Sequence, residues 1–521
     1  MHHILNRTPR WLQGVSDSLH HLEWSPATVL TVVSAWALAV VVARLVFHPL
    51  RKVPGPWLAS LTTWYEFYYD VILGGVYVKQ VLKLHERYGS DVVRIGPNHV
   101  HVNDPDFHRV VFRLGSPYLK ARFFYAAIGN PESLGTMVDP QLHQVKRSIA
   151  GHAFSPKAVA LYVPYTLQVA RRCMDSMAAD ARAGDSININ LVTQSAMADV
   201  VSMVLFGQSL GLTQCRDSQR AVLGSLNHFV NQVHIVKHLA ILFSLLRFAP
   251  RSLVARISPG YIGLRKVTST FATYVHRMKQ QKTTGPVIAD AGFSPLFDYL
   301  LTPQPKSNYV VPPADVTIDE ASAMMVGGVT TAYPLTMAVY LVLSHRDVFA
   351  RLRSELDEAA PHIRDEFNIS HVSQLPYLNA VIKETMRLYT PFPGNLPRVV
   401  PPEGVRIGSH FIPGGTYIST SLHAMHHNPK IYPDPFQFKP ERWLGERGKA
   451  MEPYFAPFSR GGQMCIASKL AYYEMYIFLS ILFSQFELDL FETSEATTDW
   501  TEHIIAATRK PVRVKIVAER W

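Results

Sequence analysis

The sequence predicts a mainly α-helical fold with a small β-rich part, preceded by one N-terminal transmembrane helix. Hydrophobic residues make up 48% of the 521 positions and charged residues only 17%, which implies a large buried core and excludes large-scale disorder. Long apolar runs rich in helix-compatible residues dominate the chain, whereas strand-like stretches are few and short. One apolar run near the N-terminus is long enough to cross a bilayer.

The N-terminal run extends from Ala27 to Phe47 with few polar interruptions. About 20 such residues span the hydrocarbon core of a bilayer. A cleaved signal peptide is the alternative, but this run is longer than a typical signal-peptide core and begins late. We therefore expect, in order, a short N-terminal segment, a transmembrane anchor, a Pro-rich hinge and one main domain: 1–24, 25–47, 48–56 and 57–521.

Basic residues near the run indicate its orientation. Arg44, Arg51 and Lys52 follow or end it, against Arg7 and Arg10 before it, and this small excess favours a cytosolic main domain on a single-pass anchor. The formal net charge of +11 comes from dispersed Lys and Arg, with no basic helix interleaved with exposed aromatics, so we expect no nucleic-acid partner. An anionic membrane surface and an acidic redox partner account for the excess.

Two stretches predict strands, 91–103 and 404–420, and helices are expected over most of the remainder. No repeat period is present. The polar stretch 279–313 is the longest candidate connection, and it predicts a surface loop within one domain.

The stretch "FAPFSRGGQMCIASKLAYYEMYIFL", 455–479, places Cys465 between a Gly-containing loop and a long apolar helix. A lone cysteine is usually a small buried hydrophobe. A predicted helix N-terminus, however, favours the thiolate form that binds metal. The only other cysteines are Cys173 and Cys215, without CxxC spacing, which argues against structural zinc, an iron–sulfur cluster or a disulfide framework and favours a reducing compartment. A single thiolate suits haem iron.

Two upstream stretches carry paired charges. In "VIKETMRLYTPFPGNLPR", Glu384 and Arg387 share a helix face at i, i+3 spacing, although a surface ion pair would show the same pattern. In "FQFKPERWLGE", Arg442 follows Pro440 and Glu441.

A third stretch, "SAMMVGGVTTAYPLTMAVYLVLSH", is too apolar for a solvated helix. A capping box over 317–320 is expected to begin it. Gly327, Gly328 and Pro334 each disfavour a regular helix, at about 1 kcal/mol for each glycine. Such defects indicate a functional kink.

Taken together, these stretches resemble the cytochrome P-450 superfamily from about residue 48 onward. Phe458, Gly461 and Cys465 match the haem-binding signature F-x-x-G-x-R-x-C-x-G, and Pro440 to Trp443 are similar to the P-E-R-F segment. The resemblance implies the cytochrome P-450 fold, with Cys465 as axial ligand of haem b. It also implies that Glu384, Arg387 and Arg442 form a buried structural triad, and that Thr330 on the kinked central helix helps to manage dioxygen and its protons.

Three positions depart from the family pattern. Val329 replaces the acidic residue that precedes the two threonines, and an alkyl side chain can neither donate nor accept a proton. We expect ordered water or a substrate group to supply that step. Gln463 replaces an arginine that would neutralise a haem propionate, for which Arg460 is a candidate substitute, and Ala467 replaces the last glycine.

The resemblance also implies cationic partners for the two propionates. His143 and Arg147 lie one helical turn apart and are similar to the family's W-x-x-x-R pair, and Arg398 is similar to a strand arginine that reaches a propionate. Surface cations are the alternative for all three. His423, His426 and His427 together could indicate a metal site. We expect no metal there, because their Pro-rich loop lacks helical i, i+4 ligand spacing.

The expected function is a membrane-anchored haem-thiolate monooxygenase of the endoplasmic reticulum, similar to fungal microsomal enzymes of secondary metabolism. Electrons would come from NADPH through a flavoprotein cytochrome reductase, with cytochrome b5 as an optional second donor. The stretches 121–130, 227–248 and 390–396 are apolar and aromatic, so a lipophilic substrate is expected, a terpenoid, polyketide or alkaloid by the resemblance. Two alternatives remain open: a haem protein of this fold without oxygenase turnover, and a redox-neutral isomerase or dehydratase.

Overall fold

The computed structural model describes residues 25–239, 259–282, 292–305 and 309–521. The expected N-terminal segment and parts of the stretches 227–248 and 279–313 lie outside these described residues.

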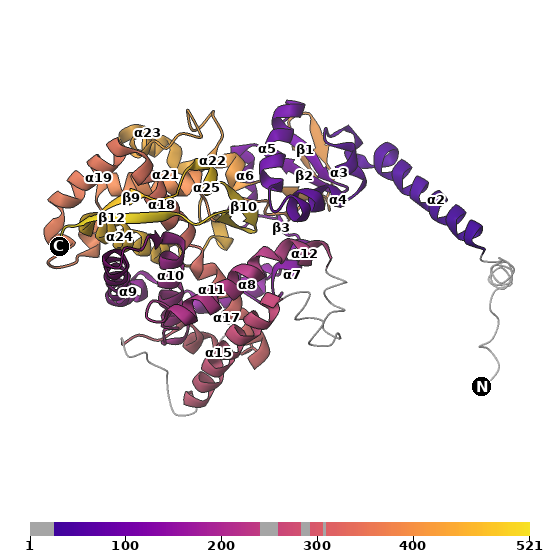
Figure 1. The fold of residues 1–521 in the computed structure, drawn as a ribbon. Helices are drawn as coiled ribbons and strands as arrows, with labels where there is room; N and C mark the ends of the chain where they lie inside the picture. Colours follow the sequence, from indigo (N-terminus) through magenta and orange to yellow (C-terminus); the bar gives the residue numbers. More distant parts are fainter. Residues whose placement is uncertain (1–24, 240–258, 283–291, 306–308) are drawn as a thin grey trace, which may run out of the picture.

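The predicted membrane-spanning helix is confirmed, and it projects away from the rest of the protein (Figure 1). Its two parts are α2 (Pro26–Val42) and the wider turn η1 (Ala43–Phe47), which together give 22 residues of mean hydropathy 2.3 with none buried. Ser25 caps the first turn, because its hydroxyl accepts from the Thr28 N–H at 3.2 Å. A long apolar rod that the protein leaves uncovered is the arrangement expected of a bilayer anchor.

Two other helical stretches are long and apolar enough to cross a membrane, Ile189–Phe206 and Ala314–Ser344. In both, 72% of the residues in the apolar window are buried inside the protein. Their hydrophobicity therefore serves the core.

Helices make up most of the main domain, as predicted. Its first helical elements lie beside the anchor: η2 (Pro49–Lys52), α3 (Trp57–Leu61), α4 (Trp64–Phe67), η3 (Tyr68–Ile72) and α5 (Tyr77–Tyr88). The next helices along the chain are α6 (Pro105–Val111), α7 (Arg122–Ile128), α8 (Pro140–Ala150), α9 (Pro156–Arg182), α10 (Ile189–Phe206), α11 (Arg216–Asn231) and α12 (Val233–His238).

The remaining helices include α17 and α18, which form the apolar stretch Ala314–Ser344. Those before the strand-rich part are α15 (Pro259–Gln281), α16 (Leu296–Leu300), α17 (Ala314–Val329), α18 (Ala332–Ser344), α19 (Arg346–Glu358), η4 (Ala360–His362), α20 (Ile369–Val372) and α21 (Pro376–Leu388). Those after it are α22 (Leu422–His426), η5 (Pro440–Trp443), α23 (Gly445–Met451), η6 (Glu452–Tyr454), η7 (Gly461–Gln463), α24 (Ser468–Gln485) and α25 (Glu495–Thr498).

A five-stranded sheet lies beside the anchor end of the domain (Figure 1). Its strand order is β1 (Val92–Gly96), β2 (His99–Val102), β8 (Tyr417–Ser419), β5 (Arg398–Val399) and β3 (Leu119–Lys120). β2 and β8 are parallel, and the other neighbours are antiparallel. The two predicted strand regions are thus confirmed: the first forms β1 and β2, and the second forms β8 and the hairpin of β6 (Val405–Ile407) and β7 (His410–Ile412).

The sequence did not predict the strands of two further sheets. One sheet contains β4 (Ile187–Asn188), β9 (Phe486–Leu490) and β12 (Arg513–Glu519), and the other is the hairpin of β10 (Trp500–His503) and β11 (Ile505–Thr508). β9 follows α24 without a loop, so apolar periodicity gives no boundary between them.

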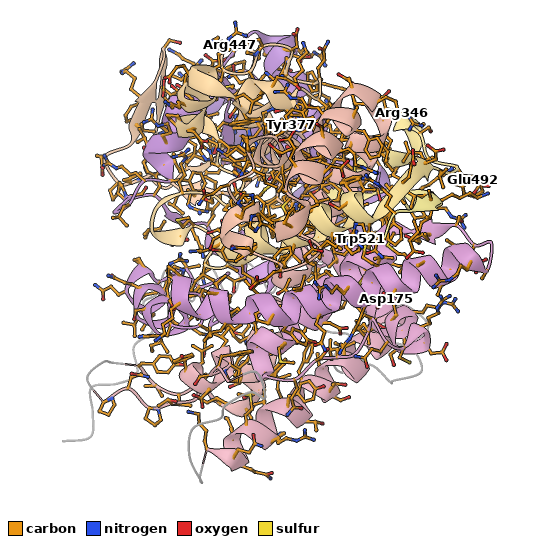
Figure 2. The ribbon with its side chains drawn as sticks, turned by 90° about the vertical axis from the view of Figure 1, so that its left-hand side faces the viewer. Asp175, Arg346, Tyr377, Arg447, Glu492 and Trp521 are labelled. Atoms are coloured by element: carbon orange, nitrogen blue, oxygen red, sulfur yellow. The ribbon has the colours of Figure 1, made fainter. Side chains whose placement is uncertain are left out.

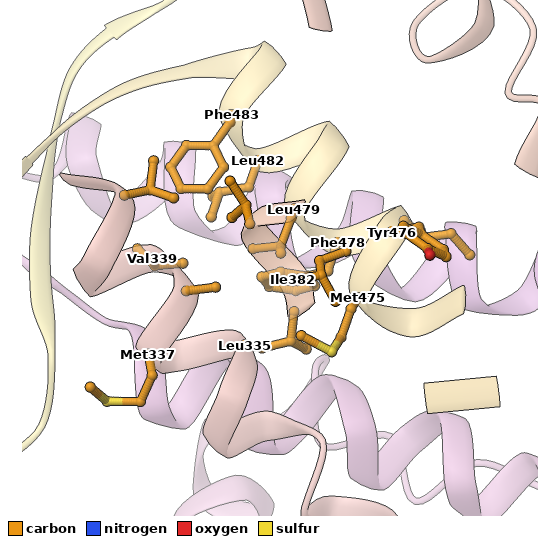
Figure 3. Close-up of a cluster of buried hydrophobic side chains, with 14 of the residues drawn as sticks. Leu335, Met337, Val339, Ile382, Met475, Tyr476, Phe478, Leu479, Leu482 and Phe483 are labelled. Atoms are coloured by element: carbon orange, nitrogen blue, oxygen red, sulfur yellow. The ribbon is translucent and has the colours of Figure 1, made fainter. Parts of the chain in front are cut away.

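The hydrophobic core lies between α18, α21 and α24 (Figure 3). Leu335 and Val339 on α18, Ile382 on α21 and Leu479 and Leu482 on α24 are all fully buried. Figure 2 shows side chains filling the interior, with labelled charged residues such as Arg447 and Glu492 at the edge. The helix that follows the cysteine is therefore fixed by packing along most of its length.

Helix α17 begins earlier than predicted, at Ala314, so the expected capping box is wrong. Thr317 instead lies inside the helix, where its hydroxyl donates to the Pro313 carbonyl at 2.7 Å. Glu320 is buried and forms an ion pair with Lys146 of α8, Nζ to Oε2, at 2.5 Å. Thr317 therefore bonds within the first turn of α17, and Glu320 connects α17 with α8.

Candidate active site

The loop before Cys465 is turned by two residues with positive φ, Ser459 at 60° and Gly461 at 68°. The Cys465 N–H donates to the Phe458 carbonyl at 2.8 Å, which closes the turn. A Cβ on Gly461 would lie 2.3 Å from the Phe112 carbonyl oxygen, so glycine is required both by the backbone conformation and by the approach of α6.

Cys465 does not lie on a helix N-terminus as predicted, because α24 begins three residues later at Ser468. Part of the Cys465 residue is accessible to solvent. Protein atoms nevertheless surround the thiol closely, and this burial raises its pKa. The Ala467 N–H and the Arg147 guanidinium lower this pKa, but their effect is smaller than that of burial. The protein alone therefore holds a thiol, and a bound metal would deprotonate it outright.

Basic side chains from three elements gather beside this loop. Arg147 on α8 donates to the carbonyl of Met464, the residue before the cysteine, at 2.7 Å. His143, one turn earlier, is buried. Lys120 and Arg398 are paired directly across β3 and β5 and are also buried, at 5% and 6% exposure.

No carboxylate forms an ion pair with Lys120, Arg147 or Arg398 in the part of the chain that the structure describes. Burial, followed by the charges of Arg398 and Arg147, lowers the pKa of Lys120 to about 7. Burial, Lys120 and Arg147 likewise lower the pKa of His143 to about 4. Burial and positive neighbours thus disfavour the protonated forms of Lys120 and His143. An anionic group among these bases, such as haem with its two propionates, would restore those protonated forms.

The structure thus brings His143, Arg147, Arg398 and Cys465 into one region, and it adds Lys120, which the sequence reading missed. The dipeptide Leu119–Lys120 belongs to no recognisable sequence motif. Only the pairing of Lys120 with Arg398 across two short strands places it here.

The departures in the cysteine loop have structural explanations. Ala467 has φ −94° and ψ 12°, an ordinary conformation for an L-residue, so glycine is not needed there. Gln463 has a buried side-chain oxygen without a hydrogen-bond partner. The Arg460 guanidinium donates through Nη2 to the carbonyls of Glu452 at 2.8 Å and Phe455 at 3.0 Å, whereas its buried Nε has no partner, so its substitution for the missing arginine stays a prediction. Lys120 is a second candidate.

The predicted interruption of the central helix falls at Thr330 and Thr331, between α17 and α18. The Thr330 hydroxyl donates to the Gly327 carbonyl at 2.6 Å, which replaces a helical hydrogen bond, and Pro334 lacks the next donor. Gly328 has a packing role that the sequence did not suggest. A Cβ at this position would lie 2.3 Å from Val201 of α10.

The interruption lies near the cysteine loop. Val329 at the end of α17 and Ile466, which follows the cysteine, contact the same hydrophobic cluster. Thr331 forms a side-chain hydrogen bond with Glu474 of α24. Thr331 at the interruption and α24, the helix that follows the cysteine loop, are therefore neighbours.

Glu474 is a functional candidate that the sequence reading missed. It is 3% exposed, and burial raises the pKa of its carboxyl group to about 8. It is therefore a neutral acid at pH 7, able to donate a hydrogen bond beside Thr331, and it lies at the interruption where Val329 provides no acid. Its signal in the sequence is a lone Glu in the apolar run "LAYYEMYIFL".

Glu384, Arg387 and Arg442 come together as a buried cluster. Glu384 Oε1 is 2.8 Å from Arg387 Nη2 and 2.8 Å from Arg442 Nε, and its Oε2 accepts from Trp443 Nε1 at 2.9 Å. Arg387 also donates to the His426 carbonyl at 2.8 Å. The charged groups of the cluster are satisfied by one another and by main-chain carbonyls such as those of Pro433 and Pro435, which is consistent with a structural role.

His423 and His426 lie in the short helix α22 and His427 caps its C-terminal end, so the predicted loop is wrong here and His423 and His427 have i, i+4 spacing. All three are buried and bonded within the protein. His427 Nδ1 donates to the His423 carbonyl at 2.9 Å. His426 Nε2 accepts from the Ala456 N–H at 3.1 Å and so supports the start of the cysteine loop. Burial and neighbouring positive charge lower the pKa of His426 and His427.

Comparison with known proteins identifies this architecture. The family model described as Cytochrome P450 matches residues 61–516. Among solved structures, the cytochrome P450DA heme domain superposes with a TM-score of 0.71 over 90% of this chain and 98% of its own, at 16% identity, which is evidence for the fold alone.

Curated relatives are cytochrome P450 monooxygenases from fungi. PenB of Penicillium thymicola is 38% identical over 84% of this chain and 98% of its own. AsqL of Emericella nidulans is 40% identical over 83% and 88%, and BOT1 of Botryotinia fuckeliana is 35% identical over 95% and 96%.

Replacing Lys120 by Gln should weaken haem retention, because one buried cation facing the propionates is lost. Charge-assisted hydrogen bonds of this kind contribute about 1.5–3 kcal/mol, so haem transfer to apomyoglobin should be about tenfold faster or more. The exposed Lys449→Gln variant is the matched control and should behave like the parent. Equal transfer rates for all three proteins would contradict a propionate-binding role of Lys120.

Glu474→Gln should change how stability depends on pH. In the folded protein Glu474 keeps a proton that the unfolded chain loses above about pH 4.5, so folding stability should fall as pH rises from 4.5 to 8. The E474Q substitution removes this dependence, because an amide does not titrate in this range. As pH rises through this window, the thermal midpoint of E474Q should increase relative to that of the parent. A constant difference between the two midpoints would show that Glu474 is ionised in the folded state.

Proposed function

This chain belongs to the cytochrome P450 family, and we propose that it is a membrane-anchored haem-thiolate monooxygenase that oxidises a lipophilic small molecule in secondary-metabolite biosynthesis. The observation that carries the proposal is the set of buried bases without acidic partners beside Cys465. The protein gives these bases only neutral oxygen acceptors, such as the Gly135 carbonyl for Lys120 at 2.8 Å, and haem b would supply two carboxylates for them and an iron for the sulfur.

Cys465 would hold the iron of haem b, and the closed turn from Phe458 would fix the direction of its sulfur. Arg147, Arg398, Lys120 and His143 would hold the propionates. Bound haem supplies the reduction and activation of dioxygen, so that one oxygen atom enters the substrate. The protein's contribution is binding, orientation and control of protons.

Protons would be handled at the interruption between α17 and α18. The Thr330 hydroxyl donates to the Gly327 carbonyl and can rotate to another acceptor. Glu474, neutral at pH 7, accepts a hydrogen bond from the Thr331 hydroxyl and is a candidate for the acid that Val329 does not provide. Ordered water between these hydroxyl groups would complete the route, in agreement with the expectation from the sequence.

The substrate is expected to be lipophilic because stretches expected to line its pocket are apolar and aromatic. In α7, Phe124 and Tyr125 are buried, and α7 packs against α12. The relatives are fungal monooxygenases by name, and the resemblance drawn from the sequence adds a terpenoid, polyketide or alkaloid as the substrate class.

Electrons would come from NADPH through a flavoprotein cytochrome reductase, with cytochrome b5 as an optional second donor. The uncovered N-terminal helix supports a single-pass anchor with the catalytic domain in the cytosol, at the endoplasmic reticulum membrane. A redox-neutral isomerase or dehydratase would need no reductase, and a non-catalytic haem protein would give no product. Product analysis with the reductase present or omitted therefore separates the three functions.

Cys465→Ser should abolish the long-wavelength Soret band that reduced haem-thiolate proteins show with carbon monoxide, together with product formation. An alcohol does not replace a thiolate as a ligand of haem iron at neutral pH. Cys215→Ser, at an exposed position, is the control and should retain both properties. Intact pigment and turnover in the Cys465→Ser protein would overturn the proposed ligation.

Val329→Asp should increase the fraction of NADPH electrons that appear in product, because it places a carboxyl group next to Thr330. Val329→Asn has nearly the same volume without the acid and should not improve coupling. Product formed and hydrogen peroxide released per NADPH are the quantities to measure. Unchanged or poorer coupling in the aspartate variant would mean that the existing route to Thr330 is sufficient.

A further inference from the structure

A group of polar side chains, most of them buried, lies beside the segments expected to line the substrate pocket. Its members come from distant parts of the chain: Asp70 of η3, His234 of α12, Asn395, and Glu502 of β10. They line one cavity of about 20 Å³. Asp70 is 2% exposed, His234 3% and Glu502 7%. None of these residues has a role in the proposed reaction.

The cavity lies close to the candidate haem site. Phe124 also lines it, and the adjacent residue Tyr125 accepts a hydrogen bond from the Arg398 guanidinium. The β10–β11 hairpin is held to one of the segments expected to line the pocket, because the Ala506 N–H donates to the Pro391 carbonyl at 2.8 Å. The cavity is thus at one end of the expected substrate pocket.

Two glycines allow the Glu502 carboxylate to approach this end of the pocket. A Cβ on Gly394 would lie 2.8 Å from Glu502 Oε1, and a Cβ on Gly75 would lie 2.3 Å from the Glu502 carbonyl oxygen. Glu502 Oε2 is 3.5 Å from His234 Nε2, but this nitrogen donates at 2.7 Å to the Glu502 main-chain carbonyl. No lysine or arginine in the described part of the chain forms an ion pair with the carboxylate.

Negative charge exceeds positive charge around the cavity. Among the described residues that line it, Lys237 is the one permanent cation. Its Nζ lies 2.8 Å from Glu66 Oε1 and 2.6 Å from Asp70 Oδ2, so this ammonium group already serves two carboxylates. Glu502 is a third carboxylate without such a partner, and an uncompensated buried charge is costly.

The lining atoms without partners are acceptors. Asp70 Oδ1 and Asn395 Oδ1 are buried and form no hydrogen bond, and neither does His234 Nδ1, which carries the lone pair of the neutral ring. Burial lowers the pKa of His234, but Asp70 and Glu502 outweigh it and raise the pKa, so a proton on Nδ1 is one way to satisfy them. Even then, the three carboxylates that line the cavity face only two cations.

We propose that Glu502, supported by Asn395, binds a protonated amine of the substrate, which is therefore an alkaloid or another basic lipophilic molecule. This inference rests on the proposed monooxygenase function and narrows its substrate class. A protonated amine brings the positive charge that the Glu502 carboxylate lacks, and its N–H groups suit the neighbouring acceptors. A space of about 20 Å³ holds one ammonium group and no ring, so the carbon skeleton would lie at the apolar side of the cavity, where Phe124 is.

The test compares the binding of octylamine and octanol to the full-length, haem-loaded protein in detergent. Octylamine is protonated at pH 7, as a lysine side chain is, whereas octanol places a neutral hydroxyl group at the same position. Dissociation constants come from equilibrium dialysis, corrected with a protein-free cell for uptake by the detergent. The parent should bind octylamine about tenfold more tightly than octanol, or better, as expected for a charge-assisted hydrogen bond. Equal affinities of the parent for the two probes would overturn the proposal.

Glu502→Gln keeps the shape of the side chain and removes its charge. It should weaken octylamine binding about tenfold or more and leave octanol binding unchanged. Glu446→Gln, at an exposed position, is the matched control and should behave like the parent. An amine preference that persists in the Glu502→Gln protein, with a Soret band shifted to longer wavelength, would place the amine on the haem iron and would also overturn the proposal.

Asn395→Asp decides the question if the Glu502→Gln protein fails to fold. This substitution adds a carboxylate beside Glu502, so octylamine should bind more tightly than to the parent while octanol does not. Unchanged or weaker octylamine binding would refute the site.

The dialysis measurement needs no turnover, so it separates this inference from the proposed function. Protein that shows the long-wavelength Soret band with carbon monoxide, but has no preference for octylamine, would refute the amine site alone. Protein without that band would refute the haem-thiolate function, whichever probe it binds.

Discussion

The buried carboxylate of Glu384 organises the protein behind the cysteine loop. It accepts from Arg387, Arg442 and Trp443, and through Arg387 it holds the carbonyl of His426, whose ring in turn accepts from the main chain of the loop at Ala456. Buried ion pairs contribute little net stability, but loss of one partner leaves an unpaired buried charge at a cost of about 3–5 kcal/mol. The cluster therefore selects one arrangement of the chain, and the direction of the Cys465 sulfur depends on that arrangement.

Charge imbalance marks the region beside the cysteine loop. Bases from α8, β3 and β5 lie near one another there without acids, and the two carboxylates of haem would complete them. Binding of haem would then be coupled to the stability of the fold.

The helix that follows the cysteine and the interrupted distal helix act as one unit. Their contact at Glu474 and Thr331 places a neutral carboxylic acid at the interruption, because burial among apolar side chains keeps the proton on Glu474. The chain thus lacks an acid at Val329 but has one on the facing helix. Close packing of α18 against α24 holds these two groups in register.

The sequence alone determined the mainly helical fold, the anchor, the strands at 91–103 and 404–420 and the importance of Cys465, since these depend on local apolar periodicity and on motifs with fixed spacing. It could not determine the start of α17, the role of Glu320, or the strands β4 and β9 to β12. Nor could it identify Lys120 or Glu474. Those residues depend on pairing and burial between segments far apart in the chain, and neither the energy of a buried charge nor its partner is encoded within a short window of sequence.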